Sequence, residues 1–294
     1  MLNIHIAVLL FGITGLFAKF ITLPSTMIVF GRCLFAVIFL FFVLKYLKSD
    51  FKFECRKDFF ITIITGLVIG VSWFFFFQSI KVSSVAVGLL SYSTVAIFTT
   101  FIEPLYFKSK IKFPDIILAL ITISGVYLVV PKFSISSNIT VGVLLGLCAA
   151  FFSAVFTIMS RGLVKKYSSI KVAFYQYLTV AILGIPFFLT DAPHISIKNL
   201  ILLIILGVIF TAFANTLFIS SLKVISATKA NIILTLEPIY GIILGIIILH
   251  ERLGIRLIIG GIIILSCAFI ATSLNMRDNI KKNKLTGIKR SSTL

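Results

Sequence analysis

Long apolar runs that contain almost no Asp, Glu, Lys or Arg recur from one end of this chain to the other. In hydrocarbon every backbone N–H and C=O group must find its partner within the protein, so only helices and closed barrels can span a membrane. The runs are mostly about 18 to 26 residues long, as membrane-crossing helices are, and they lack the alternation of barrel strands. Hydrophobic residues make up 60% of the chain and charged residues only 12%. The sequence therefore predicts an all-α membrane protein.

We expect ten transmembrane helices. They cover residues 4–21, 26–44, 59–80, 82–107, 115–130, 139–160, 172–189, 200–222, 230–249 and 257–274. The fifth span is the shortest of them. The first span resembles a signal peptide in length, but no basic segment precedes it and no small-residue cleavage site follows Ile21. We therefore expect it to remain as a helix.

The formal net charge of +18 would suggest a nucleic-acid partner in a soluble protein, but here the basic residues lie between the apolar spans. They indicate membrane topology instead, and no nucleic-acid partner is expected. With the N-terminus in the cytoplasm, 20 Lys and Arg residues fall in or beside cytoplasmic segments and six fall outside. This asymmetry predicts a multi-pass protein of the cell membrane with both termini in the cytoplasm. The basic tail, residues 275–294, is expected to lie at anionic headgroups of the lipid bilayer.

The two halves of the chain resemble each other. One constant shift, called here the repeat shift, sets Ser79–Val82 against Ser221–Val224 and Lys19 against Arg161. A two-residue adjustment of the same shift sets Phe30–Arg32 against Phe174–Gln176. Each match is weak alone, but they share nearly the same shift. The chain therefore contains an internal repeat.

We place the first repeat at residues 1–131 and the second at 139–274. Five helices is an odd number, so the second repeat must enter the membrane in the opposite sense to the first. Such inverted repeats place the substrate site of transporters near the middle of the bilayer, between the halves. Glu103–Pro104 and Glu237–Pro238 look alike, but the repeat shift does not bring them together, so they are not equivalent positions.

The stretch from Leu234 to Gly241, followed by Gly245, His250–Leu253 and Gly260–Gly261, resembles the end of a second EamA domain. In that family a Leu-Glu-Pro motif lies in the ninth helix, and a Gly-Glu-Arg-like turn follows it. Here His250 takes the place of the usual small residue. The resemblance covers essentially the whole chain and implies a ten-helix member of the drug/metabolite transporter superfamily. Members of that superfamily carry amino acids, nucleotide sugars, phosphorylated sugars or drugs, and the resemblance does not choose among them.

Glu237 is the outstanding candidate for a transport residue. It lies about midway along the ninth span, where a charged side chain costs roughly 2.5 kcal/mol or more. Pro238 cannot donate a backbone hydrogen bond, so a carbonyl one turn earlier is freed at the same depth. A carboxyl and a free carbonyl suit a polar cargo or a proton. In the competing interpretation, Glu237 bonds a neighbouring helix and Pro238 only bends the span.

Other polar and aromatic side chains also fall at membrane depth. Trp73 and Phe77 are one helical turn apart and would form one wall of a substrate pocket, although a Phe is weak support in a chain with 31 of them. The remaining candidates for substrate binding are Gln78, Tyr92, Ser93, Tyr175, Gln176, Asn215 and Asn231. For the two asparagines the alternative is an interhelical hydrogen bond, typically worth about 0.6 kcal/mol.

Charged residues near the span ends have a default role, which is to extend to the lipid headgroups. For Lys19 and Arg32 we weigh this role against a second one, in which they line an outer vestibule that attracts anionic groups. Glu103, near the cytoplasmic end of the fourth span, is expected to pair with Lys108 or Lys110.

Glycines recur four residues apart. The pairs are Gly66 and Gly70, Gly142 and Gly146, and Gly241 and Gly245. Small residues at this spacing let helices approach closely, which we interpret as packing within one bundle. Dimerisation is the rival use, so we expect a monomer or a homodimer.

The sequence has no G-x-x-x-x-G-K-[ST] loop, so transport would be secondary or passive. Its three histidines are scattered at span ends, and we expect no enzyme activity, catalytic residue, cofactor or metal site. We predict a secondary transporter that moves a small metabolite, amino acid-like or another small organic solute, by alternating access, with protons as a candidate coupling ion. Resemblance to bacterial exporters favours efflux. The alternatives are an importer or exchanger of a nucleotide-, sugar- or cofactor-like metabolite and, from another class, a membrane-embedded enzyme or a lipid flippase-like protein.

Overall fold

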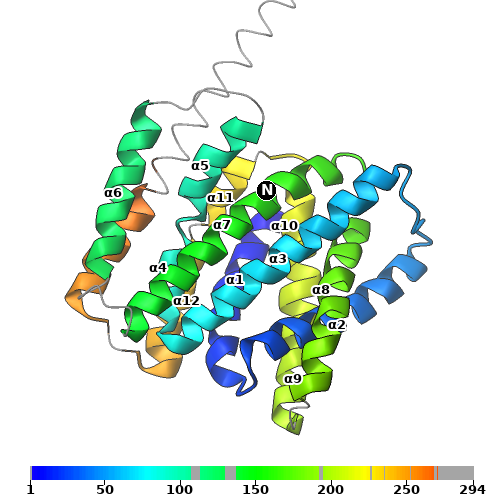
Figure 1. Cartoon of the computed structure of the whole chain (residues 1–294), viewed down its shortest axis with the longest axis horizontal. Helices are drawn as coiled ribbons and strands as arrows, with labels where there is room; N and C mark the ends of the chain where they lie inside the picture. The colour runs from blue at the N-terminus through cyan, green and yellow to red at the C-terminus, as the bar shows by residue number, and fades with distance from the viewer. Residues whose placement is uncertain are drawn as a thin grey trace, which may run out of the picture.

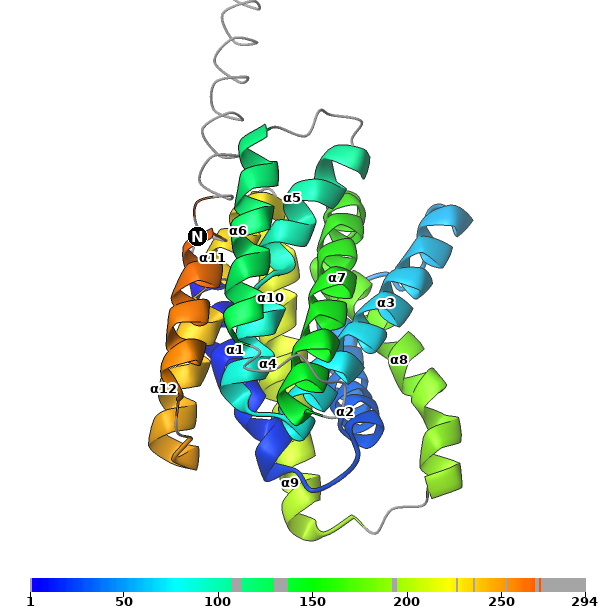
Figure 2. The same ribbon diagram turned by 60° about the vertical axis from the view of Figure 1, so that its left-hand side comes forward.

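The computed structural model describes residues 2–106, 113–129, 137–191, 195–225, 227–234, 236–251, 253–267 and 270. The helices are α1 (Leu2–Phe20), α2 (Ser25–Tyr46), α3 (Arg56–Val82), α4 (Val85–Tyr92), α5 (Val95–Tyr106), α6 (Phe113–Val129), α7 (Asn138–Val164), α8 (Ser169–Asp191), α9 (Ile197–Ile205), the π-helix η1 (Leu206–Phe213), α10 (Ala214–Ser221), α11 (Ala227–Leu234) and α12 (Glu237–Leu249). A further apolar helix covers Ile255–Cys267. The helices stand side by side in one bundle (Figures 1 and 2).

Within the described residues, seven helical segments are long and apolar enough to cross a membrane. They are Leu2–Phe20, Ser25–Tyr46, Arg56–Val82, Val85–Tyr106, Asn138–Val164, Ser169–Thr190 and Ile197–Ser221. Three shorter apolar helices are Ile116–Val129, Glu237–Leu249 and Ile255–Cys267. Each of the ten predicted spans thus contains helical residues, while the tail 275–294 lies outside the described part of the chain.

Two predicted spans are broken helices. The span at 82–107 divides into α4 and α5, because the hydroxyl groups of Ser93 and Thr94 donate to the carbonyl oxygens of Leu90 and Ser91, three residues back. Such local bonds compete with the helical ladder. The span at 230–249 divides into α11 and α12, where Pro238 lies in the first turn of α12. The expectation of continuous helices was wrong at both places.

Helix boundaries in the two halves recur at the repeat shift that relates the sequences. The start of α5 at Val95 matches the start of α12 at Glu237, and the described ends of α4, Val85 and Tyr92, match those of α11, Ala227 and Leu234. The two broken helices α4–α5 and α11–α12 therefore occupy equivalent places in the two halves. Helix contacts follow the same rule, because α3 packs against α7 while their counterparts α10 and α1 pack against each other.

Small residues allow the close helix contacts. Ser72 and Ser79 of α3 donate to the carbonyl oxygens of Ala149 and Gly142 of α7, at 2.8 and 2.5 Å. A β carbon added to Gly66 would lie 2.5 Å from the carbonyl oxygen of Gln176 on α8. The expected packing of glycines within the bundle is confirmed here and at Gly70, Gly142, Gly146 and Gly241, whereas Gly245 has only looser neighbours.

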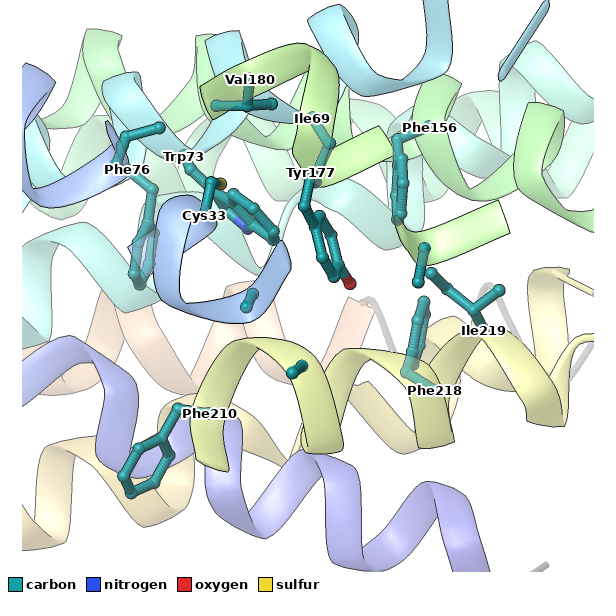
Figure 3. Packing of buried hydrophobic residues seen from close by; sticks show 14 of the residues in the cluster. Cys33, Ile69, Trp73, Phe76, Phe156, Tyr177, Val180, Phe210, Phe218 and Ile219 are labelled. Atoms are coloured by element: carbon teal, nitrogen blue, oxygen red, sulfur yellow. The ribbon is translucent and has the colours of Figure 1, made fainter. Parts of the chain in front are cut away.

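A buried hydrophobic cluster runs through the bundle. The outer surface of the bundle is apolar as well. Phe42, Ile64, Leu120 and Ile247 are each more than half exposed. In the interior the ring centroids of Trp73 and Tyr177 lie 5.7 Å apart, next to Cys33 (Figure 3). Apolar side chains inside and outside are what a helix bundle in lipid requires.

Candidate functional site

A small cavity lies inside the bundle, and eight helices contribute to its wall. Its volume is about 40 Å³, enough for water-sized molecules. The lining residues are Phe11 and Thr14 of α1, Arg32 of α2, Ile69, Trp73 and Phe76 of α3, Tyr92 of α4, Ser153 and Phe156 of α7, Asn215 and Phe218 of α10, Leu234 of α11 and Glu237 of α12. Arg32 and Glu237 therefore bring opposite charges to a wall whose other side chains are aromatic, aliphatic or neutral and polar.

The lining of the cavity reflects the internal repeat of the chain. Ten of its lining residues form five pairs that the repeat shift brings together: Phe11 and Ser153, Thr14 and Phe156, Trp73 and Asn215, Phe76 and Phe218, and Tyr92 and Leu234. Equivalent faces of equivalent helices therefore meet around one space. The three lining residues outside these pairs are Arg32, Ile69 and Glu237.

Arg32 is buried in the cavity wall, with 1% of its surface exposed. Its guanidinium carbon lies 4.0 Å from the centre of the Trp73 ring and 5.3 Å from that of Phe77, so the cation is held against aromatic faces. Its Nε donates to the hydroxyl of Thr211 at 2.8 Å. Among the described residues, none accepts a hydrogen bond from its Nη1.

The placement of Arg32 corrects an expectation. Neither a side chain that extends to the headgroups nor an outer-vestibule residue fits a guanidinium that is almost fully buried. The reason is tertiary: α2 packs closely against η1, which brings Thr211 to Arg32. Position along a span does not reveal which neighbouring helix will cover a side chain.

The π-helix η1 supports this arrangement. Thr211 donates to the carbonyl oxygen of Leu206 at 2.8 Å, and Asn215 donates to that of Phe210 at 3.3 Å, each five residues back. In this wider turn the Thr211 hydroxyl donates to the Leu206 carbonyl oxygen and also accepts the hydrogen bond from Arg32 Nε. Short π segments occur frequently at functional sites.

Glu237 is the first residue of α12 and is 4% exposed. It therefore lies at a break between two half-helices, at the start of the second. Pro238 fits this place, because the first turn of a helix does not need its missing N–H. In the described part of the chain nothing donates a hydrogen bond to the Glu237 carboxylate, and no ion pair joins it to Arg32. Among the residues that the structure describes, this carboxylate therefore faces the cavity without a hydrogen-bond or ion-pair partner.

Tyr92 and Ser153 close one side of the cavity with a hydrogen bond of 2.7 Å between their hydroxyl oxygens. Of the residues predicted from the sequence, the cavity wall therefore contains Trp73, Tyr92, Asn215 and Glu237, and also Arg32. These residues come from both halves of the chain.

Other predicted residues lie elsewhere. Phe77 is fully buried behind the Arg32 guanidinium, Gln78 accepts a hydrogen bond from Ser25 at 2.8 Å, and Ser93 bonds the backbone of its own helix. None of the three lines the cavity.

Three further residues that the sequence predicts for substrate binding belong to the second half of the chain. Tyr175 donates to the carbonyl oxygen of Phe51 at 3.1 Å, and Gln176 donates to Ser160 at 3.1 Å, both away from the cavity. Asn231 lies in α11, but its side chain is outside what the structure describes.

Several cavity residues were not predicted: Phe11, Thr14, Ile69, Phe76, Ser153, Phe156, Phe218 and Leu234. Single residues of these types are common in apolar spans and carry little information. The repeat shift would have found Leu234, because its partner Tyr92 was predicted, but three of the pairs contain no predicted residue.

Polar contacts tie the helices together at the end of the bundle opposite the N-terminus. Lys19 donates to the carbonyl oxygen of Ser83 at 3.0 Å, and Lys81 donates to that of Leu23 at 2.6 Å. Glu251 accepts from the backbone N–H of Val85 at 2.8 Å and so caps the start of α4. Lys19 thus lies at the span end where it was expected.

A second set of contacts lies at the N-terminal end. Asp58 accepts hydrogen bonds from Lys166 and Tyr167, each at 3.0 Å. The bond to Asp58 raises the pKa of Lys166 above its ordinary value of 10.5. Glu103 pairs with Arg161 at 3.0 Å, a partner that was not anticipated, while Lys108 and Lys110 lie outside the described residues.

Comparisons with known proteins agree with this architecture. The sequence pattern of the EamA-like transporter family matches residues 1–130 and 140–273. The uncharacterised transporter YxxF of Bacillus subtilis (strain 168) is 28% identical over 269 residues, which cover 87% of this chain and 86% of the relative. An uncharacterised transporter of Clostridium kluyveri is 22% identical over 77% of this chain and 75% of its own length.

One crystal structure of another protein has a TM-score of 0.69 to this chain and covers 94% of it and 97% of the other chain, at 17% identity, which shows a shared fold. The matched family segments together span almost all of the sequence, and both halves supply the cavity wall. The chain is therefore a multi-pass membrane protein that belongs to the EamA-like transporter family, within the drug/metabolite transporter superfamily.

Proposed function

We propose that this protein is a secondary transporter that carries a small organic solute, amino acid-like in size and polarity, across the cell membrane by alternating access. The main support is the cavity, whose walls pair across the two halves and hold Arg32 and Glu237. Burying these two charges inside an apolar bundle is costly unless a cargo or a coupling ion uses them.

The topology is part of the proposal. Ten helices form two inverted repeats of five, at 1–131 and 139–274, with both termini in the cytoplasm. Support comes from helix boundaries that recur at the repeat shift and from basic residues concentrated on one side of the spans. In this arrangement the cavity lies between oppositely inserted halves, near the middle of the bilayer.

Alternating access requires each end of the bundle to open while the other stays closed. At one end Lys81 is bonded to Leu23, and at the other Lys166 is bonded to Asp58. In the proposed cycle these contacts break in turn. The broken helices α4–α5 and α11–α12 supply hinges at the depth of the cavity.

Transport is tested by counterflow in vesicles that contain the purified protein. Vesicles are loaded with one unlabelled solute, and the entry of the same labelled solute is measured. Ser153→Phe places a ring in the cavity and is expected to abolish entry, whereas Ser124→Phe puts the same ring on the exposed surface of α6 and is expected to preserve it. Full activity with Ser153→Phe would contradict a cargo path through the cavity.

Glu237 is the proposed coupling residue. Its carboxylate has no hydrogen-bond donor among the described residues and is free to take up a proton on one side of the membrane and release it on the other. Glu237→Gln cannot ionise and is expected to remove any dependence of transport on a pH gradient. Glu54→Gln, in an exposed loop, is the matched control. A gradient dependence that survives Glu237→Gln would exclude Glu237 as the proton site.

The proposed direction is export, by analogy with exporters that the family contains. Cells that overproduce the protein and are preloaded with labelled solute are expected to lose it faster than cells that overproduce Ser153→Phe. Faster accumulation from the medium would establish import instead.

A further inference from the structure

A similar four-residue motif lies at the end of α3 and at the end of α10. It is Ser79–Val82 in the first half and Ser221–Val224 in the second, and the repeat shift brings Lys81 and Lys223 together. The surroundings of the two lysines differ. Lys81 is half-buried and hydrogen-bonded, whereas Lys223 is exposed and makes no hydrogen bond to any described residue. Two equivalent lysines thus adopt two different states in one structure.

Lys81 holds the turn between α1 and α2. Its Nζ donates to the carbonyl oxygens of Ile21 and Leu23, at 3.1 and 2.6 Å. These carbonyls follow the C-terminal end of α1, where backbone acceptors lack helical partners and a cation is favourable. The ammonium group therefore ties the end of α3 to the end of α1.

The acceptors that Lys223 would need for the same contact exist in the second half. Four residues join α1 to α2, and four join α7 to α8. The repeat shift, with the same two-residue adjustment, places Lys165 and Tyr167 where the first half has Ile21 and Leu23. Lys223 precedes α11, which lies beside the N-terminus in both views (Figures 1 and 2). The turn between α7 and α8 is at this end of the bundle too, since it contains the residues that bond Asp58.

Lys19 and Arg161 show the same difference. Lys19 donates at 3.0 Å to the carbonyl oxygen of Ser83, the residue that follows α3. The repeat shift matches Lys19 with Arg161 and Ser83 with Ile225. Arg161 instead pairs with Glu103 at 3.0 Å. A second basic residue of the first half thus makes a contact that its equivalent in the second half does not make.

Glu103 explains this difference between the halves. The repeat shift sets Glu103 against Gly245, which has no side chain. No carboxylate at that position competes with the carbonyl oxygen for Lys19. Arg161, by contrast, must leave Glu103 before it can reach a carbonyl oxygen. The donor of the second contact is therefore bound elsewhere in this state of the molecule.

We propose that these two pairs of basic residues are latches that close in turn. The first latch, Lys19 and Lys81, is closed in the structure and holds the end opposite the N-terminus. The second latch, Arg161 and Lys223, closes in the opposite state onto the equivalent carbonyl oxygens at the N-terminal end. In an inverted repeat, a contact that closes one end in one state has its equivalent at the other end in the other state. The inference rests on the proposed transport cycle and adds contacts of the state that the structure does not show.

The test measures how often the end opposite the N-terminus is open. Thr14→Cys places a thiol in the cavity wall, and it replaces a hydroxyl that bonds only its own helix. The exposed Cys55 and Cys148 are changed to serine, and the protein without Thr14→Cys gives the background. A membrane-impermeant maleimide is added to intact cells that produce the full chain. The labelling rate then reports access to the cavity from outside.

The two latches are expected to act in opposite directions. Lys81→Gln weakens the first latch and should raise labelling about fivefold, the shift in population that loss of one hydrogen bond typically brings. Lys223→Gln weakens the second latch and should lower labelling by a similar factor. Lys198→Gln and Lys165→Gln change exposed side chains at the same two ends and should leave labelling unchanged. Should Lys81→Gln fail to fold, Lys19→Gln removes the other contact of the first latch and should also raise labelling.

Glu103 provides a matched pair of variants. Arg161→Gln and Glu103→Gln remove the same ion pair, so a purely structural role of that pair predicts equal effects. The latch predicts opposite effects. Arg161→Gln removes a donor of the second latch and should lower labelling, whereas Glu103→Gln releases that donor and should raise it.

Two outcomes would overturn the proposal. One is labelling that Lys81→Gln and Lys223→Gln leave unchanged or shift in the same direction. The other is an equal effect of Arg161→Gln and Glu103→Gln. Counterflow distinguishes this failure from failure of the transport function. Transport that Ser153→Phe blocks, in a protein whose labelling does not respond to these substitutions, would uphold the proposed function and reject the latches.

Discussion

Gly207 of η1 packs directly against the backbone of Arg32, since a β carbon built on Gly207 would lie 2.7 Å from the Arg32 carbonyl oxygen. The same β carbon would lie 2.7 Å from Cβ of Phe35, one turn further along α2. Two backbones therefore meet where the cavity arginine is anchored. Because neither neighbour is the flexible end of a side chain, the contact has little room to adjust.

Gly207→Ala is expected to force α2 away from η1. Overpacking of this kind typically costs about 1–3 kcal/mol. We expect a lower melting temperature in detergent and, because Arg32 loses its place beside Thr211, slower transport. Gly162→Ala is the matched control, since a β carbon there meets nothing within 4 Å. Equal effects of the two substitutions would mean that the contact at Gly207 does not matter.

Glu251→Gln tests the cap on α4. The carboxylate accepts from the N–H groups of Val85 and Ala86 at 2.8 and 3.3 Å, and an amide offers only one acceptor and no charge to this helix start. We expect a loss of about 1 kcal/mol, seen as a lower melting temperature. Glu54→Gln, in an exposed loop, should have no measurable effect. An unchanged melting temperature for Glu251→Gln would show that solvent replaces the cap.

His250→Gly is expected to stabilise the protein. His250 ends α12 with φ of 54°, in the left-handed region that disfavours residues with a β carbon. Glycine adopts this region without the steric cost that a β carbon brings. The gain should be about 1 kcal/mol at most, measured as a higher melting temperature. Valine tolerates the left-handed region less well than histidine, so His250→Val should lower the melting temperature. A lower melting temperature for His250→Gly would contradict this explanation.

Lys166→Gln tests the ion pair at the N-terminal end. The bond to Asp58 raises the pKa of Lys166, so the folded state holds this proton more tightly than the unfolded chain. The pair therefore contributes fully below pH 10.5, the ordinary Lys value, and its contribution is lost as pH rises through the raised pKa. Melting temperatures of wild type and Lys166→Gln should differ by a constant amount from pH 6 to 9 and converge at higher pH. Lys165→Gln, at an exposed position, should match wild type throughout.

The helices could be predicted because lipid restricts the backbone so strongly. An apolar run of sufficient length has few alternatives to a helix, and every predicted span contains one. Trp73, Tyr92, Asn215 and Glu237 could be predicted at the cavity for a related reason, since a polar or amphipathic side chain in such a run usually faces protein.

Other features depend on contacts that a single span does not contain. The break after Tyr92 arises from hydroxyl bonds of Ser93 and Thr94, residues that are also found inside regular helices. The burial of Arg32 depends on η1, which lies far away in the sequence. Tyr175 was placed with the substrate by depth alone, but it belongs to an aromatic cluster with Phe53.

A chamber of about 40 Å³ is far smaller than the roughly 300–1,000 Å³ of pockets that enclose drug-sized ligands. No solute larger than a few atoms can occupy it until the surrounding rings move apart. In the proposed transport cycle, every turnover must then expand the protein against the lateral pressure of the surrounding lipid and close it again. The rate of that cycle should for this reason depend on how tightly the bilayer is packed as well as on the concentration of the solute.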